Sequence, residues 1–139
     1  MRVYFDENVP SAIASALREL LRGKPDSPEI FATVEVPDLG PSAEDTKIIN
    51  HIAREGGILI THDKDFRREK SIMDLLRASE TEIGVFFIKT NKQQKGFWPM
   101  ALLVINNWRK IQEVIQTVST PFWYNITSAG VADCFKKRS

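Results

Sequence analysis

Short apolar runs alternate along this chain with segments of helical character. The runs are bounded by turn residues and predict strands at 3–5, 31–36, 58–61, 83–88 and 122–127. The segments between them predict helices at 11–21, 44–55, 71–78 and 96–118. Strands that alternate with helices are typical of a three-layer α/β/α sandwich with a mainly parallel central sheet. We therefore expect an α/β fold.

The composition indicates one globular domain over residues 1–139. Hydrophobic residues make up 42% of the chain and charged residues 27%, which is ordinary for a soluble protein. The net charge of +1 means that any contact with nucleic acid must come from a local patch. A single cysteine, Cys134, fits the reducing cytoplasm. With no recognisable signal peptide or membrane-spanning run, we expect a cytoplasmic protein that does not contact a membrane.

Carboxylates follow the first and third predicted strands at the point where each strand ends. Asp6 and Glu7 come directly after the first strand, and Asp63 and Asp65 come after the third. The carboxyl ends of parallel strands meet at one edge of the sheet, where such folds bind their ligands. Asp63 and Asp65 are two residues apart, so in extended backbone their side chains face the same way. We therefore expect these acids to lie together.

A further acid opens the second predicted helix. Asp45 shares a helix face with Ile49 and Ile52, and a helix that crosses between parallel strands begins at the same sheet edge. The spacing from Ser42 also matches a capping box, and for Asp45 alone this explanation stands about even with a catalytic role. Taken together, the pattern predicts that four acids converge at one edge: Asp6, Asp45, Asp63 and Asp65.

Four carboxylates this close to one another require a cation, because like charges oppose one another's ionisation. Oxygen ligands without cysteine or paired histidine favour Mg²⁺ or Mn²⁺ over zinc. Such a site can activate water and stabilise the charge of a phosphodiester transition state. Each acid could instead be an ordinary turn residue, so it is their common edge that favours a metal site.

These segments resemble a PIN-like domain of the compact group related to VapC-type toxins. The resemblance covers most of residues 1–90 and rests on three stretches: Phe5-Asp6-Glu7-Asn8-Val9-Pro10, Ala43-Glu44-Asp45-Thr46-Lys47-Ile48-Ile49 and Ile60-Thr61-His62-Asp63-Lys64-Asp65-Phe66. It implies a PIN-like fold and a metal-dependent endoribonuclease that hydrolyses RNA with a metal-activated water. It also implies the toxin of a type II toxin–antitoxin system, with an antitoxin protein as partner.

The resemblance implies roles for individual residues as well. Three acids match its metal-binding positions and a fourth follows closely: Asp6, Asp45 and Asp63, then Asp65. Thr61 matches a hydroxyl position that supports the acidic cluster. Glu44 competes with Asp45 for the helix position, Glu7 is a further ligand or supporting acid, and Asn8 is a candidate hydrogen-bond partner of a carboxylate.

Basic residues flank the predicted acids. Lys64, Arg67 and Arg68 surround Asp63 and Asp65 in the sequence, and Lys89 follows the fourth strand, ahead of Lys92 and Lys95. Cations beside an acidic metal centre suit a polyanion such as RNA. Among them, Arg67 and Arg68 are the best candidates for contact with RNA. The long helix that contains Trp108 is a candidate surface for an antitoxin or a homodimer, and the tail Lys136-Lys137-Arg138 is expected to be a solvated terminus.

Two other functions fit parts of this pattern. A phospho-receiver domain also has acids after its first and third strands and a hydroxyl after its fourth, as at Thr90. It needs a lysine after its last strand, however, and none follows near Thr127. The other alternative is a PIN-like domain that binds partners without cleaving RNA, and the presence of all four acids argues against it.

Overall fold

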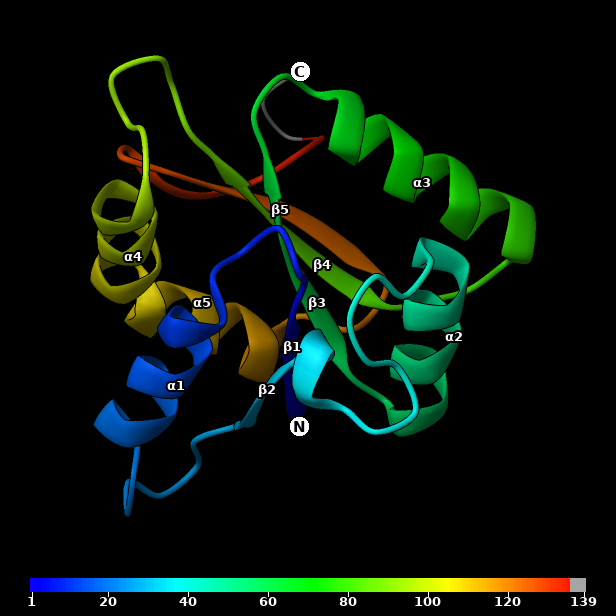
Figure 1. Ribbon diagram of the computed structural model, residues 1–139, viewed down its shortest axis with the longest axis horizontal. Coiled ribbons are helices and arrows are strands. Elements are labelled where there is room, and N and C mark those ends of the chain that lie inside the picture. The colour runs from blue at the N-terminus through cyan, green and yellow to red at the C-terminus, as the bar shows by residue number, and fades with distance from the viewer. Residues whose placement is uncertain (136–139) are drawn as a thin grey trace.

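Successive side chains of each short strand point to opposite faces of the sheet, and this alternation determines the layers of the protein. In the computed structural model, which describes residues 1–135, six strands form one sheet in the order β2-β1-β3-β4-β5-β6 (Figure 1). The first five strands run parallel, and β6 is antiparallel to β5. The strands are Arg2–Phe5 (β1), Glu29–Ala32 (β2), Ile58–Asp63 (β3), Gly84–Lys89 (β4), Phe122–Thr127 (β5) and Gly130–Asp133 (β6).

Helices cover both faces of this sheet, which confirms the predicted sandwich. One layer contains α1 (Ser11–Leu20), α4 (Phe97–Asn106) and α5 (Trp108–Thr117), and the other contains α2 (Asp45–Glu55) and α3 (Arg67–Ser79) (Figure 1). The chain reverses from α2 into β3 at Gly56, whose φ of +67° is a left-handed conformation that glycine adopts without steric cost.

Two hydrophobic cores lie on the two faces, and strand alternation assigns residues to each. In β1, Val3 and Phe5 join the core beneath α1, α4 and α5, whereas Tyr4 joins the core beneath α2 and α3. In β3, Ile60 belongs to the first core and Leu59 to the second. This alternation continues past the strand ends and decides on which side of the sheet each polar residue of the edge emerges.

Two element boundaries differ from the sequence-based expectation. The second strand covers Glu29–Ala32 instead of 31–36, because the chain turns into a short 3-10 helix at Thr33–Glu35. The third helix begins at Arg67 and not at residue 71. Its first turn is a run of charged residues without apolar periodicity, so the pattern of hydrophobic positions could not reveal it.

Two further elements near the C-terminus were predicted incorrectly. The expected helix at 96–118 is two helices that break at Asn107, whose side-chain amide donates to the carbonyl oxygens of Leu103 (2.7 Å) and Thr127 (3.3 Å). The short strand β6 was not predicted, and it pairs antiparallel with β5 through a tight turn. The tail Lys136-Lys137-Arg138 lies outside the described residues.

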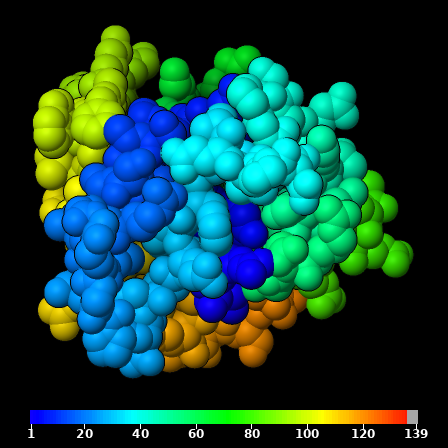
Figure 2. Space-filling model, turned by 60° about the horizontal axis from the view of Figure 1, so that its bottom comes forward, coloured from blue at the N-terminus to red at the C-terminus, as the bar shows by residue number. Residues whose placement is uncertain are grey.

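Ion pairs of Arg2 lie at the end of the sheet where the strands begin. There the first residues of the chain emerge between the segment before β2 and the end of α2 (Figure 2). Arg2 contacts the carboxylates of Glu29 and Glu55 at this end. Within residues 1–135, no helix has the length and apolarity required to cross a membrane.

Gly84 fits β4 only because it lacks a side chain. A Cβ at this position would lie 2.3 Å from Cζ of Phe122, its neighbour on β5. The Phe122 ring is buried and packs edge-on against Phe86, with 5.4 Å between the ring centroids. A larger residue at position 84 must therefore displace a ring that has no free space around it.

We expect Gly84→Ala to lower the free energy of unfolding by roughly 1–3 kcal/mol, the usual cost of overpacking a core. Denaturant unfolding measures this value. The same substitution in a Phe122→Leu background should cost less, because leucine vacates the space that the ring occupies. An equal loss in both backgrounds would show that contact with the ring is not the cause.

Candidate active site

The candidate active site lies where β1 and β3 end, which is the point at which the strand order reverses. Parallel sheets bind their ligands at such switch points. The backbone N–H of Asp6 donates to the carbonyl oxygen of Ile60 (3.0 Å), so Asp6 continues β1 alongside β3. Alternation then directs the Asp6 carboxylate to the α2 and α3 side, where only 5% of the residue is exposed. The Thr61 hydroxyl lies 2.9 Å from Asp6 Oδ2.

The Arg68 guanidinium joins the two acids that come from β1 and α2. Its Nη2 contacts the carboxylate of Asp6, and its Nη1 contacts that of Asp45. Its Nε donates to the Thr61 hydroxyl at 3.0 Å. Burial alone lowers the pKa of Arg68, but hydrogen bonds and the charges of Asp45 and Asp6 outweigh this effect and raise the pKa above its ordinary value. The guanidinium is therefore always charged in this position.

A second cation compensates Asp63. Lys89 is the register partner of Asp63 across β3 and β4, and its ammonium contacts Asp63 Oδ2 (2.5 Å) and Glu69 Oε1 (3.0 Å). Asp63 also lies at the start of α3, where its carboxylate accepts the backbone N–H of Arg68 (3.2 Å) and of Glu69 (3.3 Å). The Asp63 side chain is fully enclosed, because its exposed fraction is 0%.

The buried network extends to Cys134. Its thiol lies 3.7 Å from Glu69 Oε1 and 3.3 Å from Asn125 Oδ1. Burial, and then the charge of Glu69, raises the pKa of this thiol to about 12. The thiol is therefore protonated at neutral pH and serves as a weak hydrogen-bond donor.

Asp65 does not join the other acids, contrary to the expectation from extended backbone. The chain turns directly after Asp63, and Phe66 has a left-handed φ of +69°. Asp65 is exposed and pairs with Arg67 (2.6 Å). The hydrogen bond to Arg67, more than any other cause, holds the pKa of Asp65 below its ordinary value.

Glu7, Asn8 and Glu44 occupy different positions around the site. Asn8 bonds the backbone of His62, donating to the carbonyl oxygen (2.8 Å) and accepting from the N–H (3.1 Å), so its side chain prolongs the pairing of β1 with β3. Glu7 is exposed and accepts the backbone N–H of Ser42 (2.7 Å). Glu44 precedes α2 and is exposed. Between the two helix acids, it is Asp45 that reaches the guanidinium.

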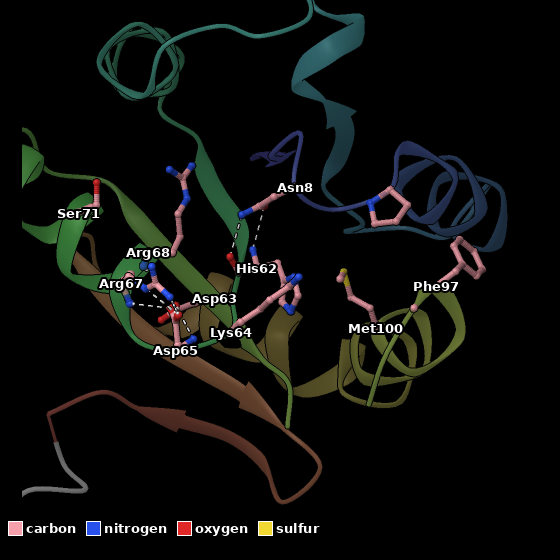
Figure 3. Close-up of a pocket in the computed structure, with 12 residues that line it drawn as sticks. Asn8, His62, Asp63, Lys64, Asp65, Arg67, Arg68, Ser71, Phe97 and Met100 are labelled. Atoms are coloured by element: carbon pink, nitrogen blue, oxygen red, sulfur yellow. Dashed lines mark hydrogen bonds and ion pairs between the residues drawn. The ribbon is translucent and has the colours of Figure 1, made fainter. Parts of the chain in front are cut away.

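Two cavities open at this edge of the sheet, beside Asp63. The first, of about 650 Å³, extends from Asp63 and Arg68 to Phe97 and Met100 of α4 (Figure 3). The second has about 580 Å³ and lies over the loop that follows β4. Four residues line both cavities, which therefore form one continuous groove: His62, Lys64, Gly96 and Met100.

The groove carries cations without internal partners. Within residues 1–135, no acid lies in ion-pair distance of Lys64, Lys92 or Lys95. His62 lies at the junction of the two cavities, and its Nε2 is 2.7 Å from the Thr90 hydroxyl. Burial, and then the charge of Lys64, lowers the pKa of His62, although Asp63 opposes the shift. His62 is therefore neutral at pH 7 and leaves the positive charge of the groove to the lysines.

Comparison with known families agrees with this geometry. Residues 1–90, which include β1 to β4 and every candidate acid, match the family described as PIN-like domain. The chain belongs to the PIN-like domain family. No match was found among curated proteins or among solved structures. PIN-like domains are a nuclease-type fold, so the family places this protein in a nuclease superfamily. Beyond the matched segment, β5 and β6 of this PIN-like domain complete the same sheet.

The acids of this PIN-like domain partly fit a divalent metal ion. Within residues 1–135, no group of three or more His, Cys, Asp or Glu side chains is arranged to hold one. Asp6 and Asp45 nevertheless fit such an ion in two respects, because they offer hard carboxylate oxygens and already share one cation. Asp63 shares a different cation in this arrangement. Metal binding by Asp6, Asp45, Asp63 and Asp65 thus remains a prediction.

Sequence reasoning missed one acid of the site, Glu69. It is buried in the first turn of α3, shares Lys89 with Asp63 and contacts Cys134. It could not be found because the helix was expected to begin only after it. One signal was available in the sequence. Parallel pairing of β3 with β4 places Lys89 beside Asp63, and a second carboxylate could share that lysine.

We expect Lys89→Met to lower the free energy of unfolding by roughly 3–5 kcal/mol at pH 7, because it leaves Asp63 and Glu69 without their shared cation. Urea unfolding measures this loss. Adding Asp63→Asn removes one of the two negative charges that Lys89 had neutralised, so the double variant should recover part of the stability. A double variant less stable than Lys89→Met alone would contradict the pairing.

Proposed function

We propose that this PIN-like domain is a Mg²⁺- or Mn²⁺-dependent endoribonuclease. One observation carries the proposal: Asp6 and Asp45, from two separate elements, converge on a single cation at the switch point of the sheet. Arg68, which contacts both acids, also lines a groove that carries unpaired lysines. Acids that require a cation, next to a surface that attracts a polyanion, suit the hydrolysis of a phosphodiester.

The proposed site uses the acids and their neighbours in different ways. Asp6 and Asp45 would hold the metal ion, with Asp63 as the next available acid. The ion would supply an activated water and stabilise the charge that develops on the phosphodiester. Thr61 orients the Asp6 carboxylate through its hydroxyl. Asn8 fixes the loop that carries Asp6 to β3 through its two bonds to the His62 backbone.

We propose that RNA lies along the groove. Lys64 contacts both cavities, while Lys92 and Lys95 line the second. Of the other predicted RNA-binding residues, Arg67 is exposed at the groove and pairs with Asp65, whereas Arg68 and Lys89 are engaged by buried acids. Phosphates of a bound strand would follow the unpaired lysines, so the second cavity would hold nucleotides next to the cleaved bond.

The finer biological setting is also a proposal, supported by the resemblance to VapC-type toxins. We propose a cytoplasmic toxin that a cognate antitoxin protein holds inactive. Trp108 is buried and donates its indole N–H to Gln112 (3.0 Å), so it is not available to a partner. An antitoxin, or a second copy in a homodimer, would instead use the exposed face of α4: Trp98 (70%), Leu102 (50%) and Ile105 (38%).

One observation favours the alternative of a PIN-like domain that binds RNA without cleaving it. Arg68 and Lys89 already neutralise Asp6, Asp45 and Asp63 from within the chain. A domain compensated in this way does not need a metal ion to remain folded. Cleavage therefore distinguishes the two functions, whereas RNA binding does not.

We expect cleavage of a mixed RNA pool in Mn²⁺ or Mg²⁺ and none in EDTA. Asp6→Asn and Asp63→Asn should each reduce the rate by at least about 100-fold, because each removes a negative charge from the proposed metal centre. Asp74→Asn is the matched control, since Asp74 is an exposed acid of α3 that pairs with Lys70. Circular dichroism establishes whether the variants fold. Folded wild type that cuts no RNA would favour the non-cleaving alternative.

We expect Lys92→Ala/Lys95→Ala to weaken binding of single-stranded RNA in EDTA. The slope of log affinity against log salt should also fall by roughly 0.7 for each phosphate that the variant no longer neutralises. Fluorescence anisotropy at several salt concentrations measures both quantities. Lys24→Ala/Arg54→Ala removes the same charge at exposed positions outside the groove and should leave the slope unchanged. Equal effects of the two double variants would argue against the groove.

A further inference from the structure

Arg68 occupies the point between Asp6 and Asp45 at which the proposed metal ion would be bound. Its two terminal nitrogens contact one carboxylate each, and its Nε bonds the Thr61 hydroxyl beside Asp6. The guanidinium thus takes one oxygen atom of each carboxylate that would bind a divalent ion. A metal ion and this guanidinium cannot use those oxygens at the same time.

The guanidinium can leave the acids only by moving, because it keeps its proton at any pH at which the protein is folded. The side chain comes from the first turn of α3 and is 20% exposed, so it is not sealed in the core. Arg68 is also one of the residues that line the first cavity. In Figure 3 its side chain extends away from Asp65 and Arg67.

An RNA phosphate in that cavity would offer Arg68 a second anionic partner. Arginine binds carboxylate and phosphate with the same planar set of donors, so a phosphate could replace the two carboxylates as the partner of the guanidinium. The phosphate would then stabilise the arginine position that leaves Asp6 and Asp45 free. The two ligands of the site would support each other's binding, because each favours the same position of one side chain.

We propose that Arg68 is an internal competitor of the metal ion, which RNA displaces from Asp6 and Asp45. The inference rests on the proposed function, because it requires that these two acids bind a divalent metal. It makes Arg68 a positioning residue that couples metal binding to RNA binding. In the absence of RNA the protein then binds Mn²⁺ weakly, and the metal centre is completed only when a substrate strand is present.

The test is Mn²⁺ affinity, measured by isothermal titration calorimetry on the full chain. Arg68→Gln removes the competing charge and should bind Mn²⁺ roughly 10- to 100-fold more tightly than the wild type. Arg77→Gln is the matched control on the same helix, because Arg77 is exposed and pairs with Asp74. It should bind Mn²⁺ with the affinity of the wild type.

A second titration adds a single-stranded phosphorothioate oligonucleotide. The oligonucleotide should tighten Mn²⁺ binding by the wild type and should have little effect on Arg68→Gln. If Arg68→Gln unfolds without metal, recovery of its thermal transition as Mn²⁺ is added shows the same competition. If it does not fold at all, Arg68→Lys should bind Mn²⁺ with intermediate affinity, because an ammonium lacks the planar pair of donors with which the guanidinium reaches both carboxylates.

The outcomes separate this inference from the proposed function. Equal Mn²⁺ affinity of the wild type and Arg68→Gln, in a wild type that cleaves RNA, overturns the competition and leaves the nuclease intact. An oligonucleotide that binds without tightening Mn²⁺ overturns the coupling. Absence of Mn²⁺ binding in the wild type and both Arg68 variants overturns the inference together with the metal dependence.

Discussion

The negative charges of buried carboxylates must be compensated, and the structure of this edge of the sheet depends on that constraint. Asp6 and Asp63 are 5% and 1% exposed, and ionised groups this deeply buried require partners of opposite charge. Arg68, in the first turn of α3, is the partner of Asp6, and Lys89 of β4 is the partner of Asp63. The same turn of α3 adds Glu69, a second acid that shares Lys89.

Strand alternation divides the same edge into two chemically different sides. Asp6, Thr61 and Asp63 emerge toward α2 and α3, and they form the buried charge network. His62, between Thr61 and Asp63 on β3, emerges on the opposite side and borders the groove. One strand therefore contributes both to the acids and to the surface that faces a ligand. The proposed chemistry and the proposed RNA path are adjacent because they share β3.

The sequence predicts the edge well because strand ends are local features. An apolar run followed by a carboxylate marks the end of a strand and placed Asp6 at this edge, and the helix face that Asp45 shares with Ile49 and Ile52 placed Asp45 there. The prediction that Asp65 joins the other acids was wrong, because the chain leaves the extended conformation after Asp63. Features that depend on distant contacts were out of reach: the break at Asn107 depends on Thr127, and β6 exists only through its pairing with β5. The sequence also could not predict which cations compensate the acids, because a cluster of acids indicates that a cation is needed without indicating which one.

The two internal cations, Lys89 and Arg68, differ in kind. Lys89 is 13% exposed, is held by two buried acids and lies 4.2 Å from the centroid of the Phe66 ring. Arg68 borders a cavity and bridges acids from two elements that only the folded chain brings together. Lys89 thus stabilises the fold permanently, whereas Arg68 stands where the folded domain can exchange its own charge for that of a ligand.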